Sequence, residues 1–250
     1  MLSGRDNEQT GSYLSARDKK NIYTSYESWK QWDQNPFGTY NKKQHYYFKK
    51  LLSNRLKTGR ETILEIGFGN GSLAGWLRDK YPNARWTGVE IQESLVTKAT
   101  ASGYESRSKL PKPDSNYSFD AVVAFDVLEH LNDSEIRDLF TDLQPILKEN
   151  GIVIARVPNG EGPMGMPNQN GDPTHVTNIS LSRLSAYLPE WNTDCQGDLR
   201  PLWEGKLLSC IRNAIRLIVR EILSWLIRFA FAPQPRTFLA SNIHLIFIRK

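Results

Sequence analysis

The chain has 250 residues (28.6 kDa), of which 39% are hydrophobic and 24% charged, and its formal net charge is +5. This length suits one α/β domain with additions, and the composition excludes fibrous, collagen-like and wholly disordered proteins. The positive balance suggests a nucleic-acid partner, yet residues 61–200 are net acidic, with 12 basic and 20 acidic side chains. The excess of positive charge lies in residues 41–60, with seven basic and no acidic side chains, and in residues 201–250, with eight and two.

Cysteine usage and hydropathy indicate the compartment. The two cysteines, Cys195 and Cys210, form no CxxC pair and have no histidine close to them in sequence, which argues against a zinc site or a disulfide framework. The first residues lack the apolar core of a signal peptide, and no uncharged apolar run reaches the roughly 18 residues that a membrane-spanning helix needs. We therefore expect a cytoplasmic protein.

Residues 1–60 are predicted to form an N-terminal segment outside the main domain. The first 20 residues are polar and are expected to lack stable structure. Aromatic side chains gather between residues 21 and 40, which is typical of a lid that packs on a folded body; a stacking platform for a sugar ring is the alternative. Tyrosine and leucine at helical spacing predict a helix over 42–57, which Gly59 ends.

Residues 61–250 are predicted to form one domain in which strands and helices alternate. Buried, non-alternating strands joined by helices are typical of a parallel sheet covered on both faces. The pattern is ambiguous between Gly103 and Phe119, and the polar loop at 158–180 is long enough to be functional. The expected elements are strands at 62–66, 86–90, 119–125, 152–157 and 243–248, and helices at 71–80, 92–101, 132–148, 181–188 and 205–231.

A glycine-rich turn joins the first strand to its helix. Ligands of open α/β sheets bind beyond the carboxyl ends of the strands, where glycines allow a close approach of the backbone. The spacing is GxGxG, whereas the dinucleotide fingerprint is GxGxxG, and Ser72 stands where its third glycine would be. Glu65 precedes the first glycine by two residues and could meet a cationic amino-acid group. Glu90 ends the second strand, where a carboxylate can accept hydrogen bonds from a ribose diol.

These residues resemble a known family. ILEIGFGNG at 63–71, VE at 89–90, SFDAVVAFDVLEHL at 118–131 and the closing strand are similar to class I S-adenosylmethionine-dependent methyltransferases. The resemblance implies a Rossmann-like, doubly wound and mostly parallel seven-stranded sheet with an antiparallel last strand, and S-adenosyl-L-methionine as cofactor. Ile91 would border the adenine, and Phe125 and Asp126 would lie near the methyl group. The cofactor-binding residues expected in this way are Glu65, Gly67, Phe68, Gly69, Asn70, Gly71, Glu90, Ile91, Phe125 and Asp126.

A second resemblance bears on the acceptor. VPNG at 157–160 with GDPTHVT at 171–177 is similar to a subset of these enzymes that methylate bacterial surface polysaccharides, other sugars or small molecules. The predicted function is methyl transfer to a hydroxyl of a sugar or surface-glycan intermediate. Two alternatives stay open: a catalytically silent cofactor-binding scaffold at a membrane, and an NAD-dependent oxidoreductase, which the GxGxG spacing disfavours.

Three residues are candidates for the catalytic chemistry. His175 lies in the long polar loop and could take the proton of an alcohol acceptor, because a near-neutral imidazole suits that step. It could equally only position the substrate. His130 follows the strand at 119–125 and is a second candidate or a packing histidine, and Asp126 could contact the cofactor or merely cap the strand end. No carboxylate cluster with ligand spacing is evident, so no metal site is expected.

The helix at 206–228 is amphipathic. At 100° per residue, its arginines occupy one half of the surface, and leucine, isoleucine and tryptophan form a broad stripe on the other. This pattern predicts either peripheral contact with the inner face of the membrane or packing on the sheet or in a homodimer. A nucleic-acid substrate is not expected, because residues 61–200 are acidic and no Asp/Asn-Pro-Pro-aromatic motif follows the strand at 119–125.

Overall fold

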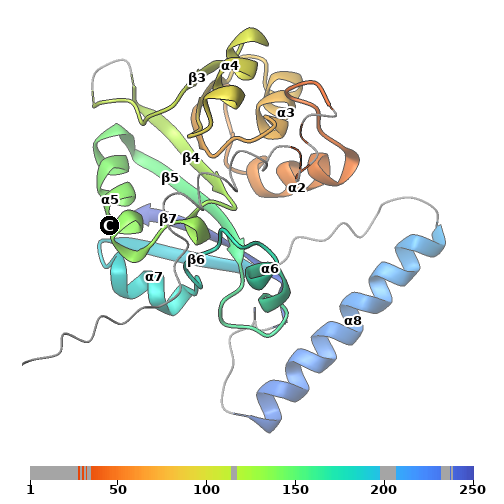
Figure 1. Ribbon diagram of the computed structural model, residues 1–250. Helices are drawn as coiled ribbons and strands as arrows, with labels where there is room; N and C mark the ends of the chain where they lie inside the picture. The colour runs from red at the N-terminus through yellow and green to blue at the C-terminus, as the bar shows by residue number, and fades with distance from the viewer. Residues whose placement is uncertain are drawn as a thin grey trace, which may run out of the picture.

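The computed structural model describes residues 28, 30, 32, 35–113, 117–197, 207–231, 237 and 239–250. The expectation for residues 1–20, and that for Tyr23, Tyr26 and Trp29 of the aromatic segment, fall outside the described residues. The described part forms a sheet with helices on both faces, and one long helix lies to the side of it (Figure 1).

The sheet has seven strands in the order β3-β2-β1-β4-β5-β7-β6. Six strands are parallel to one another, and β7 is inserted antiparallel between β5 and β6. Strands β2 and β3 extend the sheet on one side of β1, and β4 pairs with the other side of β1. The direction of strand addition therefore reverses between β1 and β4, which makes this the topological switch point of the sheet. The strands are β1 (Thr62–Ile66), β2 (Arg85–Val89), β3 (Glu105–Arg107), β4 (Phe119–Phe125), β5 (Leu147–Pro158), β6 (Trp191–Gly197) and β7 (Asn242–Arg249). The expected Rossmann-like fold is confirmed.

Helices cover both faces because neighbouring strand residues point in opposite directions. Ile63 packs with α2 (Lys42–Leu52) and α3 (Ser72–Lys80), and Leu64, next to it on β1, packs with α5 (Asp133–Leu143) and β7 on the other face. A capping box of Asn132 and Glu135 begins α5. The helices are α2 (Lys42–Leu52), α3 (Ser72–Lys80), α4 (Glu93–Ala101), α5 (Asp133–Leu143), α6 (Met166–Asn170), α7 (Leu181–Tyr187) and α8 (Leu207–Ala230), with 3-10 turns η2 (Leu128–His130) and η3 (Gln144–Ile146).

Several elements differ from the sequence-based expectation: β3 was not predicted, β5 begins at Leu147 and not at 152, and α5 ends at Leu143 and not at 148. Helix α2 ends at Leu52 and not at 57, because the chain turns there and buries Leu56 against the sheet. β6 was not predicted: it is an edge strand bonded only to β7, so most of its side chains can be polar. The short helix α6 lies within the loop at 158–180, where glycine and proline favour irregular structure.

Helix α8 differs from the other helices in what it buries. Ser224 is its only buried residue, and its large apolar side chains, from Leu208 at 78% exposed to Phe229 at 79%, face away from the sheet. The interpretation that this apolar face packs on the protein's own sheet is therefore wrong for the single chain. Within the described part of the chain, no helix has the length and hydropathy needed to cross a membrane.

Candidate active site

The glycine loop connects β1 to α3 at the carboxyl end of the sheet. Gly69 has a φ of 52° and Gly71 a φ of 72°, a left-handed conformation that glycine adopts without strain. A Cβ atom at Gly69 would lie 2.7 Å from the Trp32 ring, and one at Gly71 would lie 2.2 Å from the Phe37 ring. Two aromatic side chains of the N-terminal segment thus lie against the loop, as expected of a lid.

Glu90 faces the glycine loop from the end of β2. Its side chain is buried, and its two carboxylate oxygens accept hydrogen bonds from the N–H groups of Gly69 and Gln92, each at 3.2 Å. These bonds fix the carboxylate at the mouth of the loop. A ligand that approaches the loop therefore meets a fixed pair of hydrogen-bond acceptors.

Glu65 lies on β1, just below the loop. Its carboxylate is buried and accepts a hydrogen bond of 2.8 Å from the indole N–H of Trp86. Burial raises the pKa of Glu65 to about 8, even though the Trp86 hydrogen bond lowers it; the charge of Glu90 also raises it. A cationic ligand would relieve this repulsion between the two carboxylates.

A cavity of about 1380 Å³ extends from the glycine loop to α8. Gly71 is the only predicted cofactor residue that does not line it. The segment after β3 contributes Leu110 to the wall, and no acidic side chain of the described part of that segment lines the cavity. The predicted residues that the cavity brings together are Glu65, Gly67, Phe68, Gly69, Asn70, Glu90, Ile91, Phe125 and Asp126.

Asp126 and Arg156 form an ion pair at the ends of β4 and β5. Asp126 is the only described non-glycine residue with a positive φ, 56°, and its carboxylate accepts two hydrogen bonds from the Arg156 guanidinium. That guanidinium also lies over the rings of Tyr47, at 5.0 Å, and Phe125, at 5.3 Å. Sequence reasoning did not identify Arg156 as a site residue. The feature that could have identified it is that Arg156 is the one charged residue in the apolar run at 152–157 of β5.

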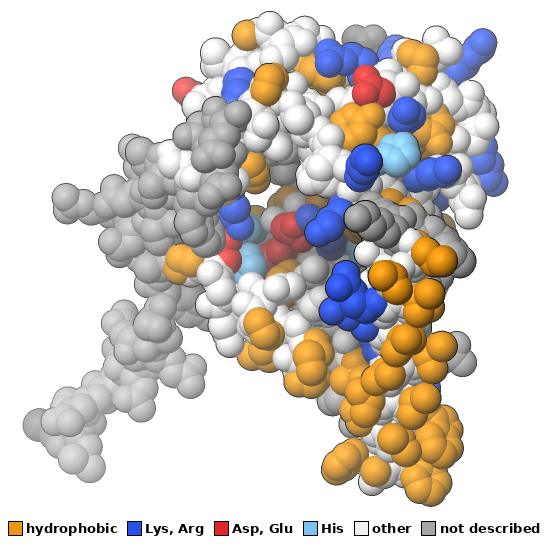
Figure 2. All heavy atoms as spheres, turned by 90° about the vertical axis from the view of Figure 1, so that its right-hand side faces the viewer, with side chains coloured by type: hydrophobic (Ala, Val, Ile, Leu, Met, Phe, Trp, Pro, Cys, Tyr) orange, Lys and Arg blue, Asp and Glu red, His pale blue; other side chains and the backbone are white. Residues whose placement is uncertain are grey.

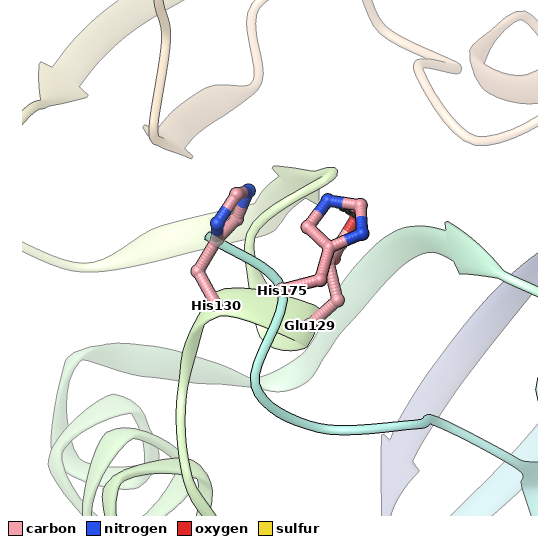
Figure 3. Close-up of side chains that lie close together, drawn as sticks. All are labelled: Glu129, His130 and His175. Atoms are coloured by element: carbon pink, nitrogen blue, oxygen red, sulfur yellow. Dashed lines mark ion pairs between the residues drawn. The ribbon is translucent and has the colours of Figure 1, made fainter. Parts of the chain in front are cut away.

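A second hollow of about 480 Å³ adjoins this pair, and two histidines line it. The rings of His130 and His175 lie with their centroids 4.7 Å apart, and Glu129 lies behind His175 (Figure 3). Burial, and then the neighbouring His175, lower the pKa of His130 to about 4, and burial also lowers the pKa of His175. Both imidazoles are therefore neutral at pH 7 and can accept a proton or bind a cation.

The loop at 158–180 holds the second hollow together. Asp172 accepts hydrogen bonds from the N–H and the hydroxyl of Thr174, at 3.0 and 2.5 Å. The ammonium of Lys30 pairs with the other carboxylate oxygen at 3.2 Å. Thr177 donates to the carbonyl of Leu131 at 2.5 Å, so the loop is tied to the turn that carries His130.

Positive side chains form the wall opposite the glycine loop. Arg212, Arg216 and Arg220 of α8 line the large cavity together with Lys43 and Lys30. Figure 2 shows Lys and Arg side chains beside the hollow and hydrophobic side chains along the outer face of α8. The sequence predicted the two faces of this helix but not that the arginines line the cavity.

Comparison with known proteins gives a match to the central part of the chain. Residues 63–151 match a family described as "Methyltransferase domain". A protein of Geobacillus sp. (strain WCH70) that is named as a methyltransferase is 29% identical over 117 residues, which are 43% of this chain and 47% of that protein. The chain thus matches about half the length of this relative.

Solved structures extend the likeness over nearly the whole chain. A SAM-dependent methyltransferase from Archaeoglobus fulgidus has a TM-score of 0.59 at 18% identity, covering 91% of this chain and 99% of that one. The plantazolicin methyltransferase BpumL, in complex with SAH, has a TM-score of 0.54 at 15% identity, covering 94% and 91%. Because both sequence identities are below 25%, the two solved structures support the Rossmann-like fold of this chain and nothing further.

Proposed function

We propose that the protein, whose residues 63–151 match a methyltransferase domain, uses S-adenosylmethionine to transfer a methyl group to a hydroxyl of a sugar or glycan intermediate. One observation carries this proposal. The glycine loop and Glu90 share a continuous cavity with His130, and the second hollow adds His175 beside it. Groups suited to holding the cofactor and groups suited to an alcohol acceptor therefore meet at the switch point of the sheet.

The residues at the glycine loop fit S-adenosylmethionine. The fixed carboxylate of Glu90 can accept hydrogen bonds from a ribose diol, and the buried carboxylate of Glu65 suits a cationic amino-acid group. Gly67 and Gly69 line the cavity and, having no side chain, present their backbone to it. When bound, the cofactor supplies a methyl group on a positively charged sulfur, which needs little activation.

The histidines suit the remaining step, the removal of a proton from the acceptor. As the acceptor oxygen forms its bond to the methyl carbon, the carbon–sulfur bond breaks and its electron pair stays on sulfur. The hydroxyl proton passes to a neutral imidazole, and we assign this role to His175, with His130 as its neighbour. Asp126 stays paired with Arg156 and fixes the turn that carries His130.

The positive wall supports an acceptor that carries an anionic group. Arginine pairs well with phosphate, and three arginines of α8 face the cavity. A sugar attached to a phosphate would place its hydroxyl near the histidines and its phosphate near Arg212 and Arg216. The histidine pair favours this interpretation over the catalytically silent scaffold, and the GxGxG spacing disfavours the oxidoreductase.

The outer face of α8 supports contact with an anionic membrane surface. Its apolar side chains are exposed as one stripe, Trp225 and Phe229 stack within it at 5.6 Å, and residues 201–250 carry a surplus of six positive charges. An acceptor anchored in that membrane would reach the arginines on the inner face of the same helix. A homodimer through this stripe is the competing arrangement.

Methyl transfer is tested with the full chain and labelled S-adenosylmethionine. Calorimetry should detect one S-adenosylhomocysteine per chain, and label should pass to phosphate-linked sugars from a cell extract. If the folded protein does not bind S-adenosylhomocysteine, both cofactor binding and methyl transfer are contradicted. Binding without any transfer to glycan, lipid-linked or nucleotide-linked sugars favours the scaffold.

Membrane contact is tested by flotation with vesicles of phosphatidylglycerol and phosphatidylcholine. The intact chain should float, and Ile215→Glu with Ile222→Glu should abolish flotation, because both side chains lie in the exposed stripe. Ile248→Glu is the matched control, since Ile248 is an exposed isoleucine of β7 outside α8. A dimer in solution that does not float would assign the stripe to a second copy of the chain.

A further inference from the structure

A cluster of three potential metal ligands lies in the second hollow. Glu129, His130 and His175 each present one ligand atom, and these atoms lie within 4.8 Å of one another (Figure 3). Glu129 and His130 come from the turn η2, which follows β4, and His175 comes from the loop after β5. We propose that these three residues bind a divalent transition-metal ion.

Glu129 is the first reason. Its side chain is fully buried, and neither carboxylate oxygen has a hydrogen-bond partner within the described part of the chain. A buried carboxylate without a partner is costly, so native proteins pair such groups with a cation or a donor. A bound cation would satisfy both oxygens.

The histidine tautomers are the second reason. The hydroxyl of Thr174 gives its single hydrogen to Asp172, so its oxygen accepts the Nδ1–H of His130 at 2.9 Å. The Nδ1 of His175 lies 3.1 Å from the carbonyl oxygen of Gln169, which can only accept, so this nitrogen also carries the hydrogen. Both rings therefore keep their lone pair on Nε2. A hydrogen bond from the remote nitrogen to a carbonyl or hydroxyl is the support that metal-binding histidines receive.

The distances around His175 are the third reason. Its Nε2 lone pair faces the carboxylate oxygens of Glu129 at 3.9 Å and of Asp172 at 3.8 Å. A cation placed among these three atoms would be attracted by all of them. Ligand atoms that share an ion at bond lengths of about 2.1 Å lie roughly 3.0 to 4.2 Å apart. The widest separation in the cluster, 4.8 Å at most, closes by a small side-chain rotation.

The ligand set indicates the kind of ion. Two imidazoles and one carboxylate suit Zn²⁺, Fe²⁺, Mn²⁺ or Co²⁺, whereas Mg²⁺ and Ca²⁺ prefer oxygen ligands alone. Three protein ligands also leave coordination positions open, as in catalytic rather than structural zinc sites. The hollow of about 480 Å³ at the cluster gives another ligand access to those positions.

The ammonium of Lys30 is the competing source of positive charge. It pairs with Asp172 at 3.2 Å, on the carboxylate oxygen that also lies near His175. In that arrangement the ammonium already balances the charge of Asp172, and the hollow needs no ion. The two arrangements, a bound metal ion and the Lys30–Asp172 pair alone, can be told apart by measurement. Only the first predicts that the protein binds one equivalent of metal and that this binding depends on Glu129.

The role of the ion rests on the proposed function. An acceptor hydroxyl bound at an open position would have a lowered pKa, so it would lose its proton to water as its oxygen forms the bond to the methyl carbon. The methyl–sulfur bond breaks in the same step, and its electron pair stays on sulfur. His175 and His130 would then act as ligands that position the acceptor, and the proton would no longer pass to His175.

The experiment measures metal content in the full chain after removal of any affinity tag. The protein is stripped with chelator, the chelator is removed, and Zn²⁺ or Co²⁺ is added. We expect one equivalent to be retained on dialysis, with Co²⁺ giving visible absorption bands typical of nitrogen and oxygen ligation. Glu129→Gln and His175→Gln should each weaken Zn²⁺ binding by about tenfold or more. His45→Gln is the control: His45 lies outside the cluster, accepts a hydrogen bond from Trp76, and should bind Zn²⁺ as the wild type does.

Binding of S-adenosylhomocysteine by the same preparations separates the two proposals and reports folding. A wild-type protein that binds S-adenosylhomocysteine but retains no Zn²⁺ or Co²⁺ overturns the metal site and leaves methyl transfer standing. Metal retained equally by the wild type and both variants also overturns it. One equivalent of metal without S-adenosylhomocysteine binding keeps the site and removes the proposed function. If a variant fails to fold, the Co²⁺ spectrum and stoichiometry of the wild type still decide.

Discussion

The two walls of the large cavity are built in opposite ways. The wall at the glycine loop consists of backbone and of two carboxylates, Glu65 and Glu90, that hydrogen bonds hold in place. The wall at α8 carries three long arginine side chains, beside Ser209, Asn213 and Leu217, on a helix that buries only Ser224. The first wall suits one cationic ligand of fixed shape. The second can adjust to anionic ligands of several shapes, so we expect cofactor specificity to be strict and acceptor specificity to be broader.

The largest effect is expected at the glycine loop. Gly69→Arg would place a long side chain where even a Cβ meets the Trp32 ring at 2.7 Å, so S-adenosylhomocysteine binding should fall by at least about a hundredfold. Calorimetry measures the change. Gly103→Ala is the control for the positive φ, because Gly103 has a φ of 80° and no atom near its Cβ position. Equal binding by the wild type and Gly69→Arg would mean that the cofactor does not lie on this wall.

The second effect concerns the stability of the cofactor wall. The pKa of Glu65 is raised to about 8 by burial, so the folded protein retains a proton that the unfolded chain loses above about pH 4.5. Its contribution to stability is fully present below pH 4.5 and is lost as the pH rises to 8. Glu65→Gln should therefore be more stable than the wild type by an amount that grows to a few kcal/mol at pH 8.

Denaturant unfolding at pH 5 and pH 8, without cofactor, measures this difference. The amide that Glu65→Gln introduces keeps an acceptor for the Trp86 indole, so the hydrogen bond is not the variable. A difference between variant and wild type that stays constant from pH 5 to pH 8 would show that Glu65 is ionised throughout.

The smallest effect is expected on the α8 wall. Arg216→Ala removes one of three arginines, and the neighbours compensate in part, so the KM for a phosphate-linked acceptor should rise by about tenfold, or 1.4 kcal/mol. The affinity for S-adenosylhomocysteine should not change. Arg228→Ala is the matched control, because Arg228 lies on the same helix but does not line the cavity. An equal loss in both variants would place the acceptor away from this wall.

The same contrast explains what the sequence could predict. Residues of the cofactor wall are neighbours in sequence or end adjacent strands, so Gly67 to Gly71 and Glu90 were identified and the cavity brings all but Gly71 together. The second hollow combines His130 with His175, 45 positions later, and this pairing depends on how the loop after β5 folds back. Glu129 gave no signal, because a glutamate in a turn that follows a strand is ordinarily solvated.

Arg156 and β6 were not predicted because each depends on neighbours in the folded sheet that the sequence alone does not reveal. A strand interior tolerates an arginine only when a partner such as Asp126 faces it, and that partner is known only from the three-dimensional arrangement. β6 contains Asn192, Asp194 and Gln196, which are typical of a loop, and only its place at the edge of the sheet makes it a strand.

The left-handed conformation of Asp126 restricts how this site can change over time. Residues other than aspartate, asparagine and glycine adopt a φ of 56° only with strain of about 1 to 3 kcal/mol. Most substitutions at position 126 therefore destabilise the fold, whatever their effect on activity. Asparagine or glycine would keep the turn but release Arg156 into the cavity as a further positive charge. A single-codon change at position 126 is thus a route by which descendants of this protein could acquire a different acceptor while Glu129 and His130 stay where they are.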